Sequence, residues 1–305
     1  MLRNLIITYA LIEPSTNLET FEHFASAVHE CSKDIVVEFC SVQNLLFTIT
    51  TGTPEIYIEE KKLKDVTDIL YLRNVEKYKD YANALRLYAD ANGIGIINYE
   101  DIRLPYYGKV SQGFLYALHH IPTPNLASAV RNETLRGWLS AKPYGYPFIL
   151  KENNGIKGRG NYLVQDKKQR GELLSQGNNN YVAQPYIENE GELRILTFGR
   201  GTDHLIFTKK AVAGLHLNNT SQGGSASQVQ KENVEEAIHK AVNLILRLTN
   251  RENLGIDVLL GTDGKWYVLE ANTTPALYTG VFLDLKAREY ARLLTTKRAK
   301  MVKHP

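Results

Sequence analysis

The stretch 254–275, in which two apolar runs flank Asp263 and Gly264, constrains the fold of this chain more than any other feature. Asp-Gly between apolar runs is a strong hairpin signal, because a type I′ turn needs positive φ at both central positions. If these two residues form the turn, the strand register places Asp257 opposite Glu270. The sequence therefore predicts a hairpin in which two acids face each other.

Side chains alternate across a strand, so this register divides the hairpin into an apolar face and a polar face. The apolar face is expected to hold Ile256, Val258, Leu260, Tyr267, Leu269 and Ala271. The polar face carries Asp257, Glu270 and Asn272. Facing like charges destabilise a sheet, and a hard divalent cation, which takes carboxylate and amide oxygens, would offset the repulsion. The alternative is that both acids point to solvent on a half-exposed hairpin.

Composition restricts the class of protein. A chain of 305 residues suggests two or three modules, and its net charge of +3 is too small to indicate a nucleic-acid partner. Cys31 and Cys40 fit no metal spacing and no disulfide framework, which favours a reducing compartment. The amino-terminal apolar stretch is too short for a membrane span and lacks a clear cleavage site. We therefore expect a cytoplasmic protein with neither a nucleic acid nor a membrane as its partner.

The first third of the chain alternates strands and helices. Strand-like runs at 5–11, 54–60, 66–74 and 94–100 are interspersed with helical patterns at 16–30 and 76–93, the second of which stops at Gly93. Such alternation predicts a parallel α/β sheet, so residues 1–104 are expected to form one open α/β module.

The rest of the chain has a different pattern. A helix is expected within 108–125, ended by Pro122, and short strands with glycine-rich turns follow from residue 147. The segment 233–248 has one apolar face and is expected to be the one long helix of that region. These features predict an antiparallel α+β arrangement.

A glycine-rich loop follows the strand that ends at Lys151. It contains Gly155, Gly158 and Gly160, together with Lys157, and a second strand comes after it. Glycines let backbone amides turn toward anionic oxygens, and lysine is a common phosphate binder. The loop is not a Walker A motif, because the Gly-Lys-Ser/Thr ending is missing. It predicts a phosphate cradle, with a simple turn as the alternative.

Two further motifs could serve a nucleotide. Pro185 in "VAQPYIENE" indicates a strand edge or break. There the Pro185 C=O and the N–H of Tyr186 or Ile187 could hydrogen-bond to a base. Glu188 or Glu190 could reach ribose hydroxyls. Arg194 follows in "ELRIL", and Lys209 and Lys210 precede a glycine-rich loop. The alternatives are a plain edge strand with surface charges and a flexible surface loop.

Taken in order, these motifs resemble the ATP-grasp superfamily, most closely its RimK-like carboxylate–amine ligases. The matching features are Lys109 in "YGKV", Lys151 with its glycine loop, "QPYI", "ELR", the "NNTSQGG" loop and the acids closing with "LEAN". The resemblance covers roughly residues 105–280. It implies an ATP-grasp fold of mixed α/β and α+β class, with a preceding α/β domain at 1–104, a central subdomain at 105–182 and a carboxyl-terminal subdomain at 183–305.

The resemblance also implies roles for residues, with ATP between two antiparallel sheets. Lys109 and Lys151 would contact the phosphates, and the loop with Lys157, Gly158 and Gly160 would fold over them. The adenine would be contacted by the hinge, which consists of Gln184, Pro185, Tyr186 and Ile187. Glu188 and Glu190 follow this hinge. The γ-phosphate or acyl phosphate would be stabilised by Arg194, Lys209 and Lys210, near the loop residue Asn219. Mg²⁺, with Mn²⁺ as a substitute, would be held by Asp257, Glu270 and Asn272.

The reaction implied is phosphoryl transfer from ATP to a carboxylate, followed by attack of an amine to give an amide or peptide bond. The partners would be carboxylate and amine substrates, the acceptor being a peptide, a protein or a metabolite, and a homo-oligomer is compatible with this scheme. Two alternatives stay open, namely a small-molecule kinase and a non-catalytic ATP-binding regulatory module. Arg73 is either a carboxylate anchor or a surface arginine at a strand end.

Overall fold

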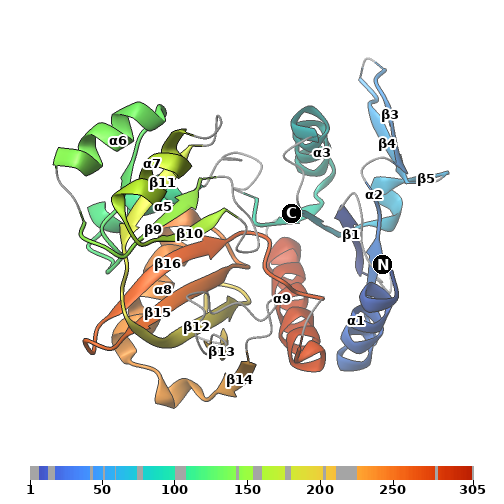
Figure 1. The fold of residues 1–305 in the computed structure, drawn as a ribbon. Coiled ribbons are helices and arrows are strands. Elements are labelled where there is room, and N and C mark those ends of the chain that lie inside the picture. The colour runs from blue at the N-terminus through green and yellow to red at the C-terminus, as the bar shows by residue number, and fades with distance from the viewer. Residues whose placement is uncertain are drawn as a thin grey trace.

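A computed structural model describes most of the chain (Figure 1). The described residues are 7–12, 18–41, 44–50, 52–58, 60–73, 78–99, 108–141, 144–153, 160–175, 180–201, 204–210, 225–278 and 281–303. They form one five-stranded sheet, two four-stranded sheets and a three-stranded sheet. Among the described helices, none combines the length and the apolar character that a membrane span requires.

The amino-terminal sheet is parallel, as the alternation of strands and helices predicts. Its strands are β1 (Ile7–Ile12), β2 (Ile35–Phe39), β6 (Ile69–Leu72) and β7 (Gly95–Ile97), in the order β2-β1-β6-β7. Helix α1 (Leu18–Cys31) covers one face and α3 (Lys79–Asn92) the other. All four residues of β6 are buried, as expected of a strand covered on both faces. Gly93 caps α3 in the left-handed region, which confirms the predicted stop.

The strand predicted at 54–60 forms, but it does not belong to the parallel sheet. Strand β4 (Glu55–Ile58) does not join the parallel sheet but pairs antiparallel with β3 (Leu45–Thr48) and β5 (Lys61–Lys62), ahead of the single turn α2 (Leu63–Val66). Strand β2, which the pattern did not indicate, takes the place beside β1. Only Ile56 of β4 is fully buried. A strand with one buried position suits a half-exposed hairpin, whereas a strand within a parallel sheet reads as a continuous apolar run.

The middle sheet is antiparallel and small. Its strands are β8 (Ala127–Ser128), β9 (Phe148–Glu152), β10 (Asn161–Val164) and β11 (Tyr181–Pro185), in the order β10-β9-β11-β8. Helices α6 (Asn132–Ala141) and α7 (Lys167–Ser175) share its apolar core. Helix α5 (Lys109–Leu118) ends before Pro122, as predicted, but its Tyr116 packs into the core of the next sheet.

The large antiparallel sheet carries the predicted acids. Its strands are β12 (Asn189–Thr197), β13 (His204–Lys210), β14 (Ser225–Val229), β15 (Gly255–Gly261) and β16 (Trp266–Asn272), in the order β14-β13-β12-β15-β16. After a short 3-10 turn (Lys231–Asn233), helix α8 (Glu236–Thr249) covers one face of the sheet. The predicted apolar face of α8 is confirmed, because Ile238, Ala241 and Ile245 are buried in that core.

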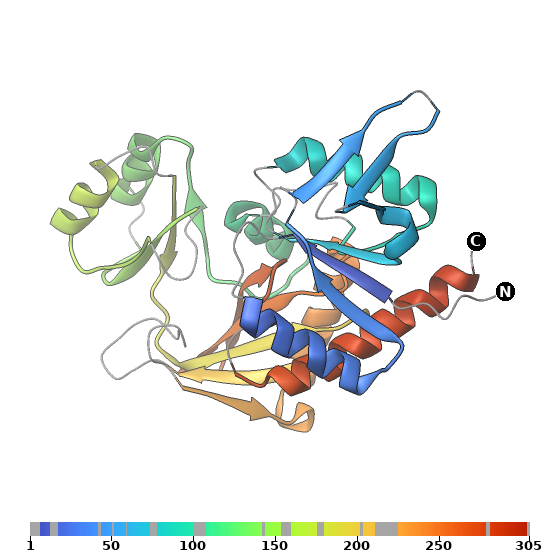
Figure 2. The same cartoon turned by 90° about the vertical axis from the view of Figure 1, so that its right-hand side faces the viewer.

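Helix α9 (Leu283–Lys303) shows that α8 is not the one long helix of this region. The stripe of Ala287, Tyr290 and Leu294 packs into a core shared with α1, β2 and β6. Charged residues surround this stripe in the sequence. Its role in the core is recognised only from its contact with α1, β2 and β6, which lie at the other end of the chain. Figure 1 shows α9 between the large sheet and α1, and Figure 2 shows the two helices side by side from another direction.

Candidate active site

The hairpin β15–β16 brings Asp257 opposite Glu270, as predicted, but not by the predicted turn. Gly261 N–H donates to Lys265 C=O over 2.8 Å, so the turn has three residues rather than two, and the type I′ prediction is wrong. Val258 consequently faces Val268, and the register shifts by one residue between Val258 and Asp257. The longer turn and this β-bulge offset each other, which restores the pairing of the acids.

The bulge changes which residues reach the core. Val268 is fully buried with Ile256, Val258 and Ala271, whereas Tyr267 and Leu269 are only half-buried. The prediction that Tyr267 and Leu269 line the apolar face is therefore wrong. The reason is the extra residue in β16, because a one-residue slip exchanges the faces of a strand.

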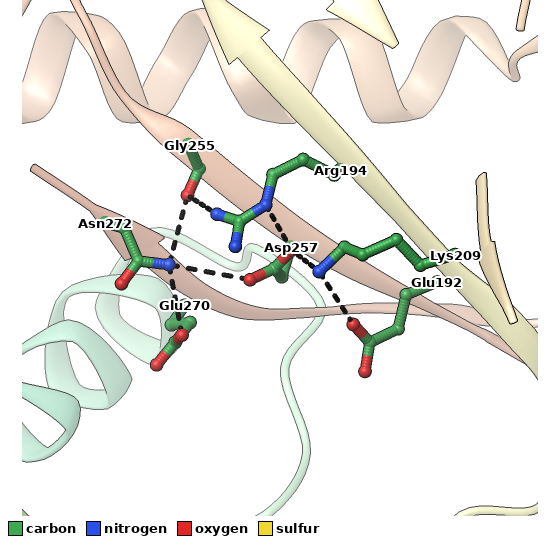
Figure 3. Close-up of polar contacts among 7 residues, drawn as sticks. All are labelled: Glu192, Arg194, Lys209, Gly255, Asp257, Glu270 and Asn272. Atoms are coloured by element: carbon green, nitrogen blue, oxygen red, sulfur yellow. Dashed lines mark hydrogen bonds and ion pairs between the residues drawn. The ribbon is translucent and has the colours of Figure 1, made fainter. Parts of the chain in front are cut away.

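Two carboxylates and an amide converge on the polar face (Figure 3). The Nδ2 amide of Asn272 donates to Glu270 Oε1 over 3.0 Å and lies 3.5 Å from both Asp257 Oδ2 and Gly255 O. Within the described part of the chain no group of three or more His, Cys, Asp or Glu side chains could hold a metal. A cation here would take two carboxylates and the amide oxygen, which rotation of the Asn272 side chain presents. This oxygen-only donor set fits a hard cation such as Mg²⁺.

Asp257 is the centre of a buried charge network. Arg194 Nε lies 3.0 Å from Asp257 Oδ1, and Lys209 Nζ lies 2.8 Å from the same oxygen. Lys209 also lies 3.4 Å from Glu192 Oε2 (Figure 3). Only 5% of Asp257 is exposed, so the alternative that both acids point to solvent is wrong for this residue. Buried carboxylates need such partners, because an unpaired buried charge is costly.

The register of the sheet explains why these side chains meet. On β12, Arg194 pairs with Asp257, while Glu192 pairs with Lys209 of β13. Alternation along each strand puts all four side chains on the face opposite α8. The same rule separates Lys209 from Lys210, which is exposed and whose Cγ lies close to Gly191. The structure therefore gathers Arg194 and Lys209 at the site and leaves Lys210 on the other side of the sheet.

Gly255 allows the close packing of Arg194. A Cβ atom at this position would lie 2.7 Å from Arg194 Nη1 and 2.9 Å from Pro275 Cβ, closer than real Cβ atoms come. The guanidinium donates from Nη1 to Gly255 C=O over 3.1 Å. Gly255 is not among the predicted site residues, although a glycine inside an apolar strand is itself a signal of close backbone approach.

Two lysines approach the acids from the elements preceding the large sheet. Burial lowers the pKa of Lys151, at the end of β9, while the carboxylates of Glu270, Glu192 and Asp257 oppose that shift and Lys109 adds to it. Lys109 donates from Nζ to Asn153 C=O over 3.3 Å, beside the predicted phosphate loop. A chain that places lysines across from paired acids can hold a polyanion together with its cation.

The strand–loop–strand arrangement around Lys151 is confirmed, because β9 and β10 pair antiparallel with Asn161 opposite Lys151. Gly160 has φ of 66°, and a Cβ there would overlap the side chain of Glu152. Only glycine fits both conditions. Lys157 and Gly158 of the same loop, and Asn219 of the later loop, lie outside the described residues.

The segment around Pro185 joins the two antiparallel sheets. Strand β11 ends at Pro185, so the predicted break is confirmed, whereas the edge-strand alternative is wrong because β11 lies between β9 and β8. Gln184 is buried, Tyr186 and Ile187 are half-buried, and Glu188 and Glu190 are exposed. The C=O of Glu188 accepts a hydrogen bond from Thr262 N–H over 2.9 Å, which ties this linker to the turn of the acid hairpin.

Arg73 is not a surface arginine. It is 4% exposed, donates from Nη2 to Pro275 C=O over 2.8 Å, and lies over the rings of Tyr71 and Tyr278. Pro275 follows the acid hairpin and contacts the Gly255 region, so Arg73 fixes the segment next to the site. Its role as a carboxylate anchor stays a prediction.

Two further residues that shape the site are not among the predicted ones. Gln112 of α5 exchanges two hydrogen bonds with the backbone of Ala271, donating to its C=O over 3.2 Å and accepting from its N–H over 2.7 Å. This contact fixes β16 next to the acids. Lys286 of α9 is 6% exposed. Burial lowers the pKa of its amine, and the positive charge of Arg194 lowers this pKa further. A lysine within a charged helix gives no sequence signal of burial.

Residues 108–287 match the RimK-like ATP-grasp domain, so the chain belongs to the RimK-like ATP-grasp family. The matched range begins just before Lys109 and ends just after Lys286, and it includes the two antiparallel sheets and the acid hairpin.

Named relatives agree with this placement. The chain is 25% identical to human N-acetylaspartylglutamate synthase A over 252 residues, which are 79% of this chain and 63% of that protein. It is 23% identical to β-citrylglutamate synthase B of Danio rerio over 247 residues, which are 78% of this chain and 60% of that protein. The alignments thus span somewhat less than two thirds of these relatives.

Solved structures show the ATP-grasp fold. D-alanyl-alanine synthetase A from Vibrio cholerae superposes with a TM-score of 0.70 at 13% identity, over 99% of this chain and 100% of that one. A RiPP-associated ATP-grasp ligase from Chryseobacterium gregarium, in complex with ADP and a leader and core peptide, gives 0.69 at 15% identity, over 96% and 97%. The ATP-grasp ligase PsnB, complexed with minimal precursor, Mg and ADP, gives 0.66 at 12% identity, over 99% of both chains.

Proposed function

We propose that this chain is an ATP-dependent carboxylate–amine ligase that forms an amide or peptide bond through an acyl phosphate. The observation that carries the proposal is the facing pair Asp257 and Glu270, with the cations Arg194 and Lys209 on the same face of the sheet. Lys151 faces these acids from the other antiparallel sheet. Membership of the RimK-like ATP-grasp family supports the assignment.

In this proposal the nucleotide lies between the two antiparallel sheets. Lys151 and Lys109 bind phosphate oxygens, and the hinge from Gln184 to Ile187 contacts the base. Mg²⁺, for which Mn²⁺ can substitute, is held by Asp257, Glu270 and Asn272 and neutralises charge on the phosphates. The paired acids, which repel each other, are then balanced by the cation as well as by Arg194 and Lys209.

The reaction consists of two displacements. A substrate carboxylate oxygen attacks the γ-phosphorus of ATP, the bond to ADP breaks, and an acyl phosphate forms. An amine then attacks the acyl carbon, phosphate leaves, and the amine loses a proton. Arg194 and Lys209 stabilise the negative charge on the phosphoryl group in both displacements, so the protein acts mainly by positioning and charge neutralisation.

We propose the chemical classes of the two substrates but not the individual compounds. The curated relatives are named as synthases of two glutamate compounds, and one of the solved structures holds a leader and core peptide. These names favour an acid and an amino acid, the acceptor being a peptide, a protein or a small metabolite. Cys31 and Cys40 are not joined by a disulfide, which supports a cytoplasmic location.

The test is oxygen transfer. The purified chain is incubated with ATP, Mg²⁺ and pooled acids and amines, and the product is identified by mass spectrometry. The identified acid is then labelled with ¹⁸O in its carboxylate. One labelled oxygen is expected in the released phosphate, because phosphate leaves with the oxygen that attacked the γ-phosphorus.

Three results would contradict all or part of the proposal. A product that carries the phosphoryl group on a hydroxyl, with no amide, identifies a small-molecule kinase. Binding of ATP without turnover of any substrate pool identifies a regulatory module. An amide product whose phosphate carries no label rules out the acyl phosphate alone.

A further inference from the structure

The acid hairpin has an open end, opposite its turn, where its two strands continue into other segments of the chain. Gly255 begins β15 and pairs with Asn272, the last residue of β16. Asn253 lies two residues before Gly255, and Thr273 directly follows Asn272. The positions of Asn253 and Thr273 therefore affect where Asn272, a predicted metal ligand, lies relative to Asp257.

Two side chains of the amino-terminal module bridge this open end. The hydroxyl of Tyr71, in β6, donates to Thr273 C=O over 2.8 Å and lies 3.0 Å from Asn253 Oδ1. The Nδ2 amide of Asn98, which follows β7, donates to Asn253 C=O over 2.6 Å and to Thr273 C=O over 3.3 Å. Each of the two side chains therefore contacts both strand ends of the hairpin.

Asn98 also fixes the backbone that leads into β15. Its Oδ1 accepts hydrogen bonds from the N–H groups of Glu252 and Asn253, each over 2.9 Å. The φ of Asn98 is 52°, in the left-handed region that asparagine adopts more readily than most residues. Water cannot replace these bonds, because Tyr71, Asn98 and Asn253 are each no more than 1% exposed. The loss of one bond therefore leaves a buried polar group unsatisfied.

The polar cluster is not needed to hold the modules together. An apolar core shared by α1, β2, β6, β12, β13 and α9 already joins the amino-terminal module to the large sheet. Apolar contacts are non-directional, whereas a satisfied network of buried hydrogen bonds specifies one arrangement of the groups that it joins. The groups joined here are the two strand ends of the acid hairpin, so the cluster determines their relative position.

We propose that Tyr71 and Asn98 are positioning residues of the metal site, through which the amino-terminal module controls the affinity for Mg²⁺. This inference rests on the proposed function, in which Asp257, Glu270 and Asn272 hold the cation. Neither Tyr71 nor Asn98 touches the metal, and both act through the backbone of the hairpin. Mg²⁺ demands near-ideal octahedral geometry, so a hairpin whose open end can shift holds it less tightly.

The test is built on Tyr71→Phe, which removes one hydroxyl and keeps the ring in the apolar core. Tyr88→Phe is the matched control. Tyr88 is also a buried tyrosine of the amino-terminal module, and its hydroxyl also donates over 2.8 Å, but to Glu55 Oε2 of β4 rather than to the hairpin. Both variants lose a buried hydrogen bond, so a drop in melting temperature is expected in both and does not separate them.

The measurement that separates them is binding of a non-hydrolysable ATP analogue to the full chain, by calorimetry, over a range of Mg²⁺ concentrations. Tyr71→Phe should raise the Mg²⁺ concentration for half-maximal binding about threefold to tenfold, whereas Tyr88→Phe should leave it unchanged. Asn98→Gly should raise it further, because glycine suits the positive φ and all side-chain bonds of Asn98 are lost. If Asn98→Gly does not fold, Tyr71→Phe still decides the outcome.

Two outcomes would overturn the positioning role. One is the same Mg²⁺ dependence in Tyr71→Phe and Tyr88→Phe. The other is weaker binding of the analogue in Tyr71→Phe that saturating Mg²⁺ does not restore, because the effect would then lie on the nucleotide and not on the cation. The unsubstituted chain separates this failure from that of the proposed function. If its binding of the analogue does not depend on Mg²⁺, the metal site itself is wrong.

Discussion

The two hairpins that meet at the site, β15–β16 and β9–β10, balance their charges in opposite ways. Asp257 of β15 finds Arg194 and Lys209 within its own sheet, at 3.0 and 2.8 Å. Lys151 of β9 is influenced by carboxylates of the other sheet, chiefly Glu270 and Glu192. Asp257 is therefore paired with cations within its own sheet. Lys151 depends on what lies between the sheets.

This difference implies that one hairpin contributes to fold stability and the other chiefly to nucleotide binding. Charges that are satisfied within one sheet contribute to the stability of the fold as well as to the site. A half-buried lysine whose partners lie across a sheet boundary contributes chiefly to binding, because loss of solvent disfavours its charged form until a polyanion binds. Substitutions in the two hairpins should thus separate stability from nucleotide affinity.

The largest effect is expected for Asp257→Asn. Arg194 and Lys209 would lose the carboxylate between them, and removal of one partner from a buried ion pair costs about 3–5 kcal/mol of unfolding free energy. Urea denaturation measures the loss. Asp263→Asn, in the exposed turn of the same hairpin, is the matched control. If both variants are destabilised equally, the acid network does not stabilise the sheet.

Glu270→Gln should preserve the fold but weaken the metal site. The amide keeps the size of Glu270, whose partner in the structure is the Asn272 side chain at 3.0 Å. Loss of one charged ligand, at about 1.5–3 kcal/mol, raises the Mg²⁺ concentration needed for half-maximal turnover about tenfold or more. A Mg²⁺ titration of ATP turnover measures the shift, and an unchanged titration curve would argue against Glu270 as a ligand.

Lys151→Met should weaken binding of the ATP analogue about tenfold or more, through loss of one charge-assisted contact of about 1.5–3 kcal/mol, without lowering stability. Calorimetric titration with the analogue measures the first effect. Unchanged affinity would remove Lys151 from the phosphate site.

The same variant also tests the pH dependence of stability. Burial lowers the pKa of Lys151 below its ordinary value of 10.5, so near that pH the unfolded chain binds more protons at this site than the folded chain does. Stability therefore gains from Lys151 as pH rises toward 10.5. Denaturation curves of Lys151→Met should show a flatter rise over that window, and an equal rise would contradict the lowered pKa of Lys151.

The smallest effect is expected for Lys210→Met. Lys210 is exposed and lies on the opposite face from Lys209, so its loss should change the unfolding free energy by no more than about 0.5 kcal/mol. Turnover should fall at least tenfold less than in Lys209→Met. Equal losses in the two variants would show that Lys210 does reach the site.

The sequence by itself determined the chemistry of the acid face. Alternation along β16 assigns Glu270 and Asn272 to one face, whereas the facing of Asp257 and Glu270 depends on the register of the hairpin. The order of the motifs identifies the family. The break at Pro185 follows from the missing N–H of proline. Such features are local, since they depend on periodicity and on single residues, and a reader of the sequence can find them.

The register of that hairpin shows how a local rule can succeed through compensation. A three-residue turn and the bulge at Leu269 each shift the pairing by one residue, in opposite senses. The acids still meet, but Val268 replaces Tyr267 and Leu269 in the core. A bulge depends on the packing of a whole sheet face, so no short sequence motif predicts it.

Only the tertiary structure decided which distant elements complete the site. Arg73 of the amino-terminal module is buried against Pro275, and Lys286 of α9 is buried as well. The sequence leaves Arg73 as either a carboxylate anchor or a surface arginine and gives no signal that Lys286 is buried, because periodicity tells which residues share a face but not which partner covers that face. The burial of a charge is a property of the contact between segments, and that contact exists only in the folded chain.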